Sequence, residues 1–451
     1  MLAIAPTAPA PAWRQRPWKQ ALLWLSFLGP LFFATYLGSL EIVSWRQHVP
    51  VIVFDWERHI PFLAWTIVPY WSIDILYGIA LFLPPTRGEL RTLAFRLLTA
   101  QIVATIIFLV APLRLTSTIP ADTGAFATFY GALGEVITKP FNMAPSLHIA
   151  LLVILWAAYH RNLPRRWHWL MHIWAVLIGA SVMTAFQHHF FDVPTGALLG
   201  LFCLWLWPDG AASPITQFQL TKDARRWRLA AYYAAGACAL LITGTLVWGS
   251  ALWLWWPAVS LAFVAFAYAG GGAATFQKSS DGQHSLAVRV LLWPYHVGAW
   301  INSRAWTSRL VHAAEVADGI HIGRIPSTAS TSLSVVDLTA ELHKPAGLAN
   351  WRSVPALDLV AVPLPALREA VRHIEHMRLS HAGQASGVLV CCALGFSRSA
   401  AAVAAWLVAS GRAANVADAV AAVQRVRPQV RIGAEQLSVL EAIRAAEHVH
   451  E

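Results

Sequence analysis

The residues with the clearest chemical potential lie in one short loop near the C-terminal end of the chain. An apolar run, Val388–Cys391, is followed by the loop Cys392–Arg398 and by an alanine-rich helical run from Ser399. This loop has the form C-x5-R and opens a predicted helix, whose dipole and free N–H groups lower a thiol pKa and bind phosphate oxygens. A guanidinium can hold two such oxygens at once. The pattern predicts nucleophilic attack by cysteine on a phosphate ester.

Four residues of this stretch receive individual roles. Cys392 is the predicted nucleophile, because a thiolate attacks where a thiol does not, and Arg398 is the predicted phosphate clamp. Gly395 lets the backbone curl around the phosphate oxygens. The Ser399 hydroxyl can hydrogen-bond to the sulfur when it leaves in the second step.

This stretch resembles the dual-specificity members of the protein tyrosine phosphatase superfamily. The resemblance covers about 315–446 and includes two runs that look like the family's first strands and one that looks like its general-acid segment: 319–326, 335–342 and 354–375. It implies that Asp358 protonates the leaving oxygen, with Asp337 as the weaker candidate.

The loop departs from that family at one position, where Cys391 replaces the usual histidine before the nucleophile. Three interpretations of Cys391 are open. Loss of the histidine raises the pKa of Cys392, Cys391 has a redox role, or Cys391 is an ordinary buried strand residue. Relatives that act on phosphoinositides tend to carry Lys or Arg inside the loop, and this loop has none. That absence argues against a polyanionic headgroup and leaves a lipid monophosphate or a phosphoprotein open.

A second set of ionisable residues interrupts apolar segments earlier in the chain. The runs PSLH (145–148) and HHFFD (188–192) lie at the ends of predicted membrane spans. Ionisable side chains are costly there and indicate function. The spacing of His188 and Asp192 lets a carboxylate orient an imidazole nucleophile, and His148 could protonate a leaving group.

These motifs resemble the type 2 phosphatidic acid phosphatase superfamily over about 50–207. The resemblance implies that His188 forms a phosphohistidine, Asp192 orients it, His148 is the acid and base, and Ser146 helps to bind substrate. The PSLH form looks more like the branch that contains inositol-phosphoryl transferases.

The phosphate anchors of that superfamily are missing here. Its Lys-x6-Arg-Pro motif is not evident, and Val182 stands where an arginine usually precedes the nucleophile. The substitute anchors that we expect are Arg114, Lys139 and His189. Neither mechanism needs a metal, and we expect no cofactor.

The chain that must position these residues is mostly a membrane protein. It has 451 residues, 57% apolar and 12% charged, against roughly 25% charged in soluble domains, which excludes disorder, collagen and coiled coil. All but two of its 23 tryptophans lie at or before Trp306, as expected for membrane interfaces. Apolar runs predict eight spans: 20–39, 62–83, 93–111, 146–160, 168–186, 191–207, 228–248 and 251–269.

Loop charges orient these spans. With the N-terminus inside, the outer segments carry only Arg46, Arg58, Arg114 and Lys139, while most other Lys and Arg residues of this half are inner. This explains the net charge of +10 without nucleic acid. It predicts a plasma membrane protein, in the bacterial inner membrane, with both termini cytoplasmic, His188 outside and Cys392 inside.

The predicted architecture is a membrane all-α helical bundle followed by a cytoplasmic α/β domain. Residues 1–19 form a tail, 20–269 a polytopic membrane domain, 270–309 a linker and 310–451 the dual-specificity-phosphatase-like domain. Within the linker, 284–306 either lies on the inner membrane surface or packs against the next domain. Strand-like runs at 333–338 and 387–391 alternate with helical runs at 364–379, 399–411, 416–426 and 434–446.

The whole pattern predicts a bifunctional integral-membrane phosphatase, with an outer phosphohistidine site and an inner phosphocysteine site. The expected substrates are phospholipids or other lipid phosphates, with a phosphoprotein as alternative at the inner site. Three other interpretations stay open: the membrane half is a lipid headgroup phosphotransferase, it is a lipid sensor that regulates the inner phosphatase, or the inner domain only binds.

Overall fold

The computed structural model describes residues 16–136, 139–327, 333–380 and 387–447. It divides into two compact units, Met1–Ser213 and Pro214–Glu451. The first contains the predicted motif core 50–207, while the last two predicted spans belong to the second. Most of the predicted N-terminal tail and the last four residues of the chain lie outside the described residues.

The first unit is all-helical. Its helices are α1 (Trp18–Ser44), α2 (Ile67–Ala80), α3 (Arg87–Val110), α4 (Ala127–Val136), α5 (Leu147–Asn162), α6 (His168–Thr184) and α7 (Asp192–Leu206), joined by 3-10 turns at Asp55–His59, Ala64–Thr66, Gly124–Phe126 and Arg165–Trp167. Helix α5 packs against α2, α3, α6 and α7. Gly196 of α7 allows this packing to be close, because a Cβ there would lie 2.4 Å from the carbonyl oxygen of Ser146.

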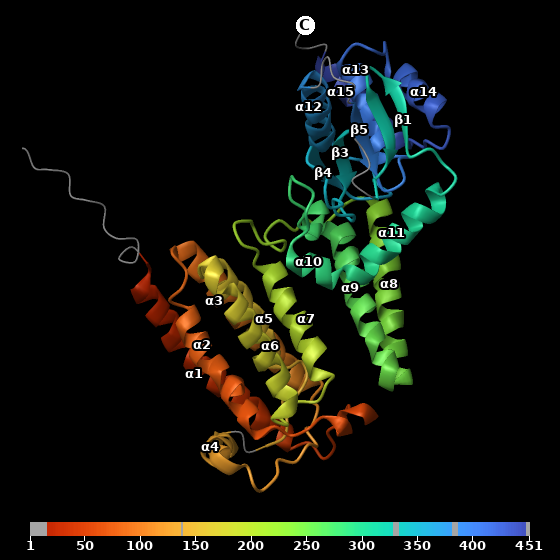
Figure 1. The fold of residues 1–451 in the computed structure, drawn as a ribbon. Coiled ribbons are helices and arrows are strands. Elements are labelled where there is room, and N and C mark those ends of the chain that lie inside the picture. The colour runs from red at the N-terminus through yellow and green to blue at the C-terminus, as the bar shows by residue number, and fades with distance from the viewer. Residues whose placement is uncertain (1–15, 137–138, 328–332, 381–386, 448–451) are drawn as a thin grey trace, which may run out of the picture. The chain divides into compact units, whose positions relative to one another are not determined.

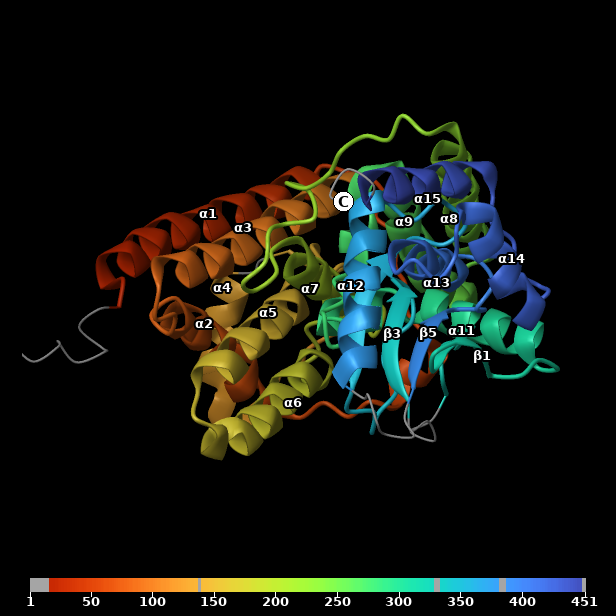
Figure 2. The same ribbon diagram turned by 90° about the horizontal axis from the view of Figure 1, so that it is seen from above.

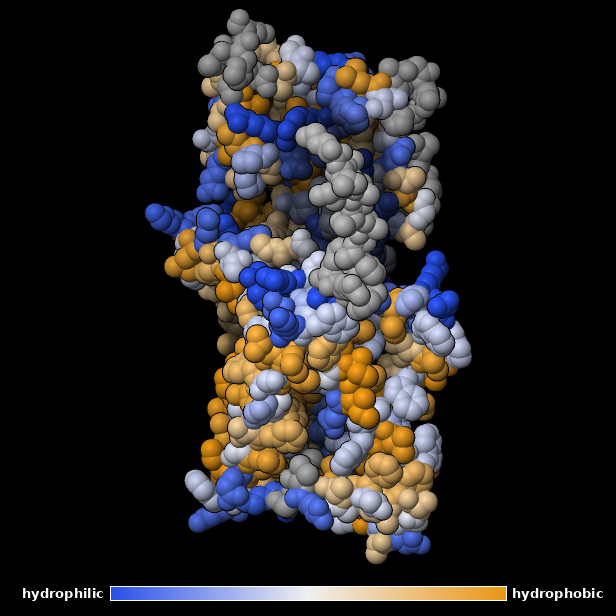
Figure 3. All heavy atoms as spheres, turned by 90° about the vertical axis from the view of Figure 1, so that its left-hand side faces the viewer, coloured by the Kyte–Doolittle hydropathy of each residue, from blue (hydrophilic) through white to orange (hydrophobic). Residues whose placement is uncertain are grey.

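The outer surface of this unit is apolar along its helices. Leu22, Leu23, Phe27 and Phe33 of α1 are all exposed, and Figure 3 shows apolar side chains covering much of the face that carries α1. Exposed apolar patches of this extent mark a surface that another apolar phase covers.

Each of the eight predicted spans coincides with a helix. By length and composition, four helical stretches among the described residues can cross a membrane: Trp18–Ser44, Arg87–Val110, Ala224–Val247 and Gly249–Gly271. The other four, α2, α5, α6 and α7, have 14, 16, 17 and 15 residues. Their crossing of the bilayer stays a prediction.

Charged side chains gather at the end of the bundle opposite the start of α5. Arg161, near the C-terminus of α5, pairs with Glu89 at 3.1 Å and Asp209 at 2.8 Å. The buried Arg96 pairs with Asp209 at 3.1 Å and donates to the Trp207 carbonyl at 2.9 Å. The apolar middle of the bundle is therefore bounded by an ionic cluster at this end.

The second unit begins with helices and continues into a sheet. The helices are α8 (Ala224–Val247), α9 (Trp255–Phe266), α10 (Leu286–Leu291) and α11 (Trp293–Thr307), with 3-10 turns at Gly249–Leu254 and Ala273–Phe276 and a π turn at Ala267–Gly271. Figure 1 shows α8 and α9 side by side, extending away from the sheet. The two run antiparallel, so the start of α8 and the end of α9 lie at the same end.

The sheet has five strands in the order β1-β2-β5-β3-β4. These are β1 (Ala313–Ala317), β2 (Ile320–Arg324), β3 (Ser334–Thr339), β4 (Trp351–Ala356) and β5 (Val388–Cys392). Among the described strands, β1 and β2 pair antiparallel, while β2, β5, β3 and β4 are parallel neighbours. The central strand β5 is buried along its whole length, as expected for a parallel strand covered on both faces.

Two layers cover the sheet. One face packs on α12 (Leu364–Ser380), α13 (Arg398–Ala409), α14 (Val416–Val426) and α15 (Ala434–Glu447), and Figure 2 shows α12 and α13 alongside β3 and β5. The other face forms a smaller core that includes Val335, Trp351, Leu389 and Cys391, with Ala299 of α11 against it. These elements confirm the strands and helices predicted within 310–451.

The segment predicted as a linker packs tightly onto this sheet. The Lys278 ammonium is fully buried, 2.5 Å from the carboxylate of Asp337, and donates to Thr339 and Leu342 carbonyls. The Cβ that Gly282 lacks would lie 2.4 Å from the Trp351 ring nitrogen. A buried ion pair with extra hydrogen bonds fixes this segment in one place.

Helix α11 has two different faces. Its Ser303 is buried and donates to the Ala393 carbonyl at 2.5 Å, so one face packs against the sheet domain, as one of the two alternatives predicted. Its other face exposes Trp300, Ile301 and Trp306. Contact of this second face with a membrane surface stays a prediction.

Candidate active sites

The loop after β5 curls because its backbone is forced into an unusual conformation. Strand β5 ends at Cys392, one residue later than predicted. Helix α13 begins at Arg398, one residue earlier than predicted. Gly395 has φ +78°, and a Cβ there would lie 2.6 Å from the backbone of Gly323. A side chain at this position would disrupt the turn, so glycine is required for the reason that the sequence indicated.

The Cys392 sulfur lies at the centre of this curl. The N–H of Gly395 donates to Cys392 Sγ at 3.2 Å, and the Ser399 hydroxyl donates to it at 3.3 Å. Burial would raise the pKa of the thiol, but the charge of Arg398 and the hydrogen bonds from Ser399 outweigh burial and lower the pKa. The Cys392 thiol is therefore more acidic than an ordinary cysteine thiol, without the histidine that the resemblance led us to expect.

Arg398 is fixed by a carboxylate that the sequence analysis did not single out. Glu341 accepts from both terminal nitrogens of Arg398, at 2.6 and 2.8 Å, and the Ala356 carbonyl accepts at 2.9 Å. Burial would raise the pKa of Glu341, but the adjacent guanidinium lowers it. This bidentate pair presets the plane of the guanidinium.

Asp358 lies at the mouth of the same site. Its carboxylate is 3.2 Å from Arg398 Nη2, and its side chain is 35% exposed. Its backbone carbonyl accepts a 3.0 Å hydrogen bond from the hydroxyl of Tyr268. Leu359, the next residue, has φ +60°, so Asp358 lies in a tight turn with its carboxyl facing the site.

The weaker candidate acid, Asp337, is corrected by the structure. It is fully buried and ion-paired with Lys278. It therefore has no access to a leaving group, whereas Asp358 lines the cavity over Cys392. The sequence could not distinguish them, because both follow apolar runs and the partner of Asp337 comes from 59 residues earlier.

Cys391 faces away from Cys392, because neighbouring strand residues point to opposite faces of a sheet. It is buried in the smaller core with Val335 and Leu389. Burial, together with the charges of Asp337 and Cys392, raises its pKa well above the ordinary value. Of the three interpretations of Cys391, this placement favours the buried strand residue.

A cavity of about 560 Å³ opens over Cys392. Its lining includes the predicted Asp358, Cys392 and Arg398 and two further arginines, Arg225 and Arg431, which the sequence analysis did not assign to it. Arg225 lies in the first turn of α8, more than 160 residues before the loop, so no local pattern could reveal it. The cavity thus combines a nucleophile, an acid and several cations.

The motifs of the first unit also meet. Ser146 precedes α5 and Asp192 begins α7, and the Ser146 N–H donates to the Asp192 carbonyl at 3.0 Å. His188 Nδ1 is 3.1 Å from Asp192 Oδ2, and its Nε2 is 3.2 Å from Ser146 Oγ. One ring nitrogen of His188 therefore faces the Asp192 carboxylate, and the other faces the Ser146 hydroxyl.

His148 lies two residues after Ser146, in the first turn of α5. Its ring stacks on Tyr70 of α2, with centroids 4.1 Å apart and an interplanar angle of 10°. Its buried Nε2 has no hydrogen-bond partner in the described part of the chain. An orphaned buried nitrogen beside the His188 pair marks a position where a ligand group could bind.

The three candidate phosphate anchors differ in their availability. Lys139 is ion-paired with Glu41 and donates to Ser44 at 2.9 Å. Arg114 is exposed, on the segment whose Thr116 contacts His189. Of the two, Arg114 is the one not already paired with a carboxylate in the described residues.

His189 has both ring nitrogens engaged. The Thr116 N–H donates to its Nε2 at 3.1 Å, so its Nδ1 carries the proton and donates to Glu57 at 3.3 Å. Burial would raise the pKa of Glu57, but the hydrogen bonds from His189 and from the Phe54 and Phe190 N–H groups lower it. These contacts correct the expectation that His189 anchors phosphate: it holds the loop that carries His188.

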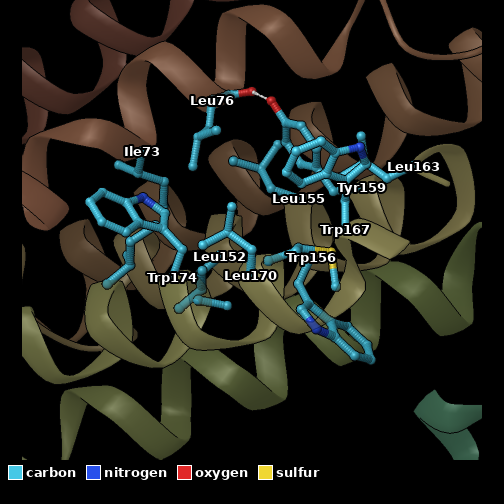
Figure 4. A pocket seen from close by; sticks show the side chains of 13 residues that line it. Ile73, Leu76, Leu152, Leu155, Trp156, Tyr159, Leu163, Trp167, Leu170 and Trp174 are labelled. Carbon is cyan, nitrogen blue, oxygen red and sulfur yellow. Dashed lines mark hydrogen bonds between the residues drawn. The ribbon is translucent and has the colours of Figure 1, made fainter. Parts of the chain in front are cut away.

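A separate cavity of about 310 Å³ lies between α2, α5 and α6. Figure 4 shows that apolar side chains line it, including Leu152, Trp167 and Trp174, with the Tyr159 hydroxyl turned to the Leu76 carbonyl at 2.9 Å. It contains no acid, base or nucleophile among the described residues that line it. We therefore assign it no phosphate chemistry.

Comparison with known proteins places the likeness in less than a third of the chain. Neither a family model nor a curated protein matches it. Among solved structures, PTPMT1 in complex with PI(5)P is 19% identical, with 31% of this chain and 99% of that chain covered and a TM-score of 0.25. Human DUSP28 is 23% identical, covering 31% and 99%, with a TM-score of 0.27, and Tk-PTP in the active form is 24% identical, covering 30% and 97%, at 0.25.

These structures are phosphatase domains of the protein tyrosine phosphatase type, the type that the cysteine loop resembles. None of these three structures is described as containing the His188 motifs or a fusion of two catalytic halves. The chemistry of both sites therefore depends on their own geometry.

Proposed function

We propose that the second unit hydrolyses phosphate monoesters through Cys392. The thiolate attacks phosphorus, so that an S–P bond forms while the bond to the ester oxygen breaks. A phosphate oxygen takes the place of the Asp358 carboxylate on Arg398, and Asp358 gives its proton to the leaving oxygen. The loop N–H groups and Arg398 bind the charge that gathers on the phosphoryl oxygens.

In the second step, water attacks the phosphocysteine and gives its proton to Asp358. The S–P bond breaks, and Cys392 leaves as a thiolate that accepts from the Ser399 hydroxyl. The balance is one water consumed per ester, with an alcohol and inorganic phosphate released. The observation that carries this proposal is the convergence of the Cys392 sulfur, a preset guanidinium and a carboxyl on one cavity.

A second activity is favoured by the His188, Asp192 and Ser146 contacts and by the orphaned nitrogen of His148. In this proposal, His188 Nε2 attacks a lipid phosphate, Asp192 stabilises the imidazolium, and His148 protonates the leaving group. Water then attacks the phosphohistidine and gives its proton to His148, and the N–P bond breaks to release inorganic phosphate and His188. If an alcohol on another lipid replaces water, the first unit is a headgroup phosphotransferase, and the product contains the acceptor alcohol.

The proposed topology puts these two sites on opposite faces of one membrane, because the positive-inside rule assigns His188 outside and Cys392 inside. A reporter enzyme fused after Glu451 tests this arrangement. Reporter activity is expected in the cytoplasm, and activity only outside would contradict it.

The decisive experiment measures phosphate release by detergent-purified protein from phosphatidate, phosphatidylglycerophosphate, an isoprenoid phosphate, phosphoinositides and a phosphopeptide. Cys392→Ser and His188→Ala are each expected to abolish release from a different substrate. Release that neither substitution affects would refute both sites. If His188→Ala instead changes the Cys392 activity, the first unit regulates the second.

A further inference from the structure

One wall of the Cys392 cavity is formed by the start of helix α8. Arg225 lines it and lies in the first turn of α8, a 24-residue helix long and apolar enough to cross a membrane. Among the described residues, its side chain has no hydrogen bond or ion pair that would occupy the guanidinium. A free cation therefore faces the cavity from the end of a candidate membrane span.

Two further contacts join the catalytic residues to the apolar helices. Tyr268, just after α9, donates to the carbonyl of Asp358 at 3.0 Å. Ser303 of α11 donates to the carbonyl of Ala393, the residue after the nucleophile, at 2.5 Å. The acid and the cysteine loop are thus held by helices outside the sheet layer.

The surface of α8 beyond its first turns requires an apolar environment. Tyr232, Ile242, Leu246 and Val247 are 71, 58, 79 and 67% exposed. The basic residues lie before or near the start of the helix, at Lys222, Arg225, Arg226 and Arg228, beside the exposed Trp227. A membrane interface is placed at such a boundary of basic and aromatic residues.

The lining of the Cys392 cavity also combines basic side chains with apolar ones. Arg225 and Arg431 provide positive charge, while Leu359, Val360 and Phe396 provide apolar surface. Leu359 is 50% exposed although it adjoins the acid. This combination matches an amphiphile with a phosphate head, since the head needs cations and its attached chain needs apolar contacts.

We infer that the substrate of the Cys392 site is a lipid phosphomonoester drawn from the bilayer into which α8 inserts, and that Arg225 is a specificity-determining residue that binds its headgroup at the membrane surface. This inference rests on the proposed function of Cys392. Because the end of a spanning helix forms one wall, the cavity opens at the height of lipid headgroups. A phosphoprotein would have to approach through that same interface.

The test uses the full chain with His188→Ala, so that the first unit contributes no release, reconstituted in nanodiscs. The two substrates are dioleoyl phosphatidate in the same disc and soluble p-nitrophenyl phosphate. Arg225→Ala is expected to lower kcat/KM on phosphatidate by about tenfold, the effect of one charged hydrogen bond, and to lower the ratio of lipid to soluble activity. Arg228→Ala removes the same charge from the same helix outside the cavity lining and is expected to leave this ratio unchanged.

The outcomes separate this inference from the proposed function. If Arg225→Ala leaves the ratio unchanged, or a tyrosine phosphopeptide in solution is cleaved more efficiently than phosphatidate, the lipid inference is overturned while p-nitrophenyl phosphate release that Cys392→Ser abolishes still supports the cysteine mechanism. If Cys392→Ser retains full release from every substrate, the proposed function itself fails.

Discussion

The hydroxyl of Tyr268 donates a 3.0 Å hydrogen bond to the backbone carbonyl of Asp358. Tyr268 lies in the π turn that follows the apolar helix α9, and Asp358 is the proposed general acid. Tyr268 is 2% exposed, so this bond is shielded from water. It fixes the turn from which the acid must reach the leaving oxygen.

Tyr268→Phe is therefore expected to slow protonation of the leaving group. Loss of a neutral hydrogen bond costs about 0.5–1.5 kcal/mol, or roughly two- to tenfold in rate. This fall should appear in kcat for an alkyl phosphate but not for p-nitrophenyl phosphate, whose leaving group needs little protonation. Tyr232→Phe, on the exposed surface of α8, is the matched control, and equal losses on both substrates would contradict the positioning role.

Glu341→Gln is expected to loosen the phosphate clamp. The two Glu341 oxygens accept from Arg398 at 2.6 and 2.8 Å, and charged hydrogen bonds are worth about 1.5–3 kcal/mol. We expect kcat/KM to fall about 10- to 100-fold, with a lower midpoint of thermal unfolding. Glu369→Gln, on the exposed side of α12, should change neither quantity, and an unchanged kcat/KM in Glu341→Gln would show that Arg398 needs no buttress.

The lowered pKa of Cys392 determines the acidic limb of the pH profile. Because the thiolate is the reactive form, iodoacetamide labelling should rise with pH through a pKa below the ordinary value of about 8.5. Ser399→Ala removes a donor to the sulfur and should move this limb to higher pH by about half a unit to one unit. Ser410→Ala, at the other end of α13, is the control.

Mass spectrometry of the labelled peptide identifies which cysteine reacts. Of the two neighbouring cysteines, only Cys392 should be labelled near neutral pH, because the pKa of Cys391 is raised. Preferential labelling of Cys391 would reverse the assignment of the nucleophile.

The geometry of the cysteine loop could be predicted because its signals are local. Cys392, Gly395, Arg398 and Ser399 lie within eight consecutive residues, so the role of each could be inferred from the sequence of one loop. The same holds for His188 and Asp192, four residues apart across a helix start. The eight apolar helices were also found from composition, although length and composition together support a crossing for only four helical stretches among the described residues.

The supporting contacts could not be predicted, because they join distant positions. Glu341 reaches Arg398 across 57 residues, and Tyr268 reaches Asp358 across 90. Glu341 lies in the same run as Asp337, which the resemblance gave only as the weaker candidate acid, and it received no role from the sequence. His189 matched the expected chemistry by type, yet Thr116 and Glu57 occupy its nitrogens.

Removing one partner of the buried ion pair of Lys278 and Asp337 should strongly destabilise the fold. Both side chains are inaccessible to solvent, so Lys278→Met leaves an uncompensated carboxylate, at a cost of about 3–5 kcal/mol. We expect a large fall in the midpoint of thermal unfolding in detergent. The double variant Lys278→Met/Asp337→Leu should recover part of that loss, whereas Lys222→Met, on the exposed surface, should have little effect.

Asp192→Asn tests the proposed phosphohistidine site most directly. Asp192 accepts from His188 Nδ1 and from the His189 N–H, so it sets both the tautomer and the position of the ring. An amide in its place can donate instead of accept, which allows the wrong tautomer, and in triads of this kind the loss is roughly 10²- to 10⁴-fold. We expect that loss in phosphate release from lipid substrates by protein that also carries Cys392→Ser.

Asp122→Asn, in an exposed turn of the same unit, should retain activity. Since asparagine nearly preserves the shape of aspartate, an unchanged unfolding midpoint together with this loss would assign Asp192 to the chemistry, and full activity of Asp192→Asn would show that the chemistry does not need this carboxylate.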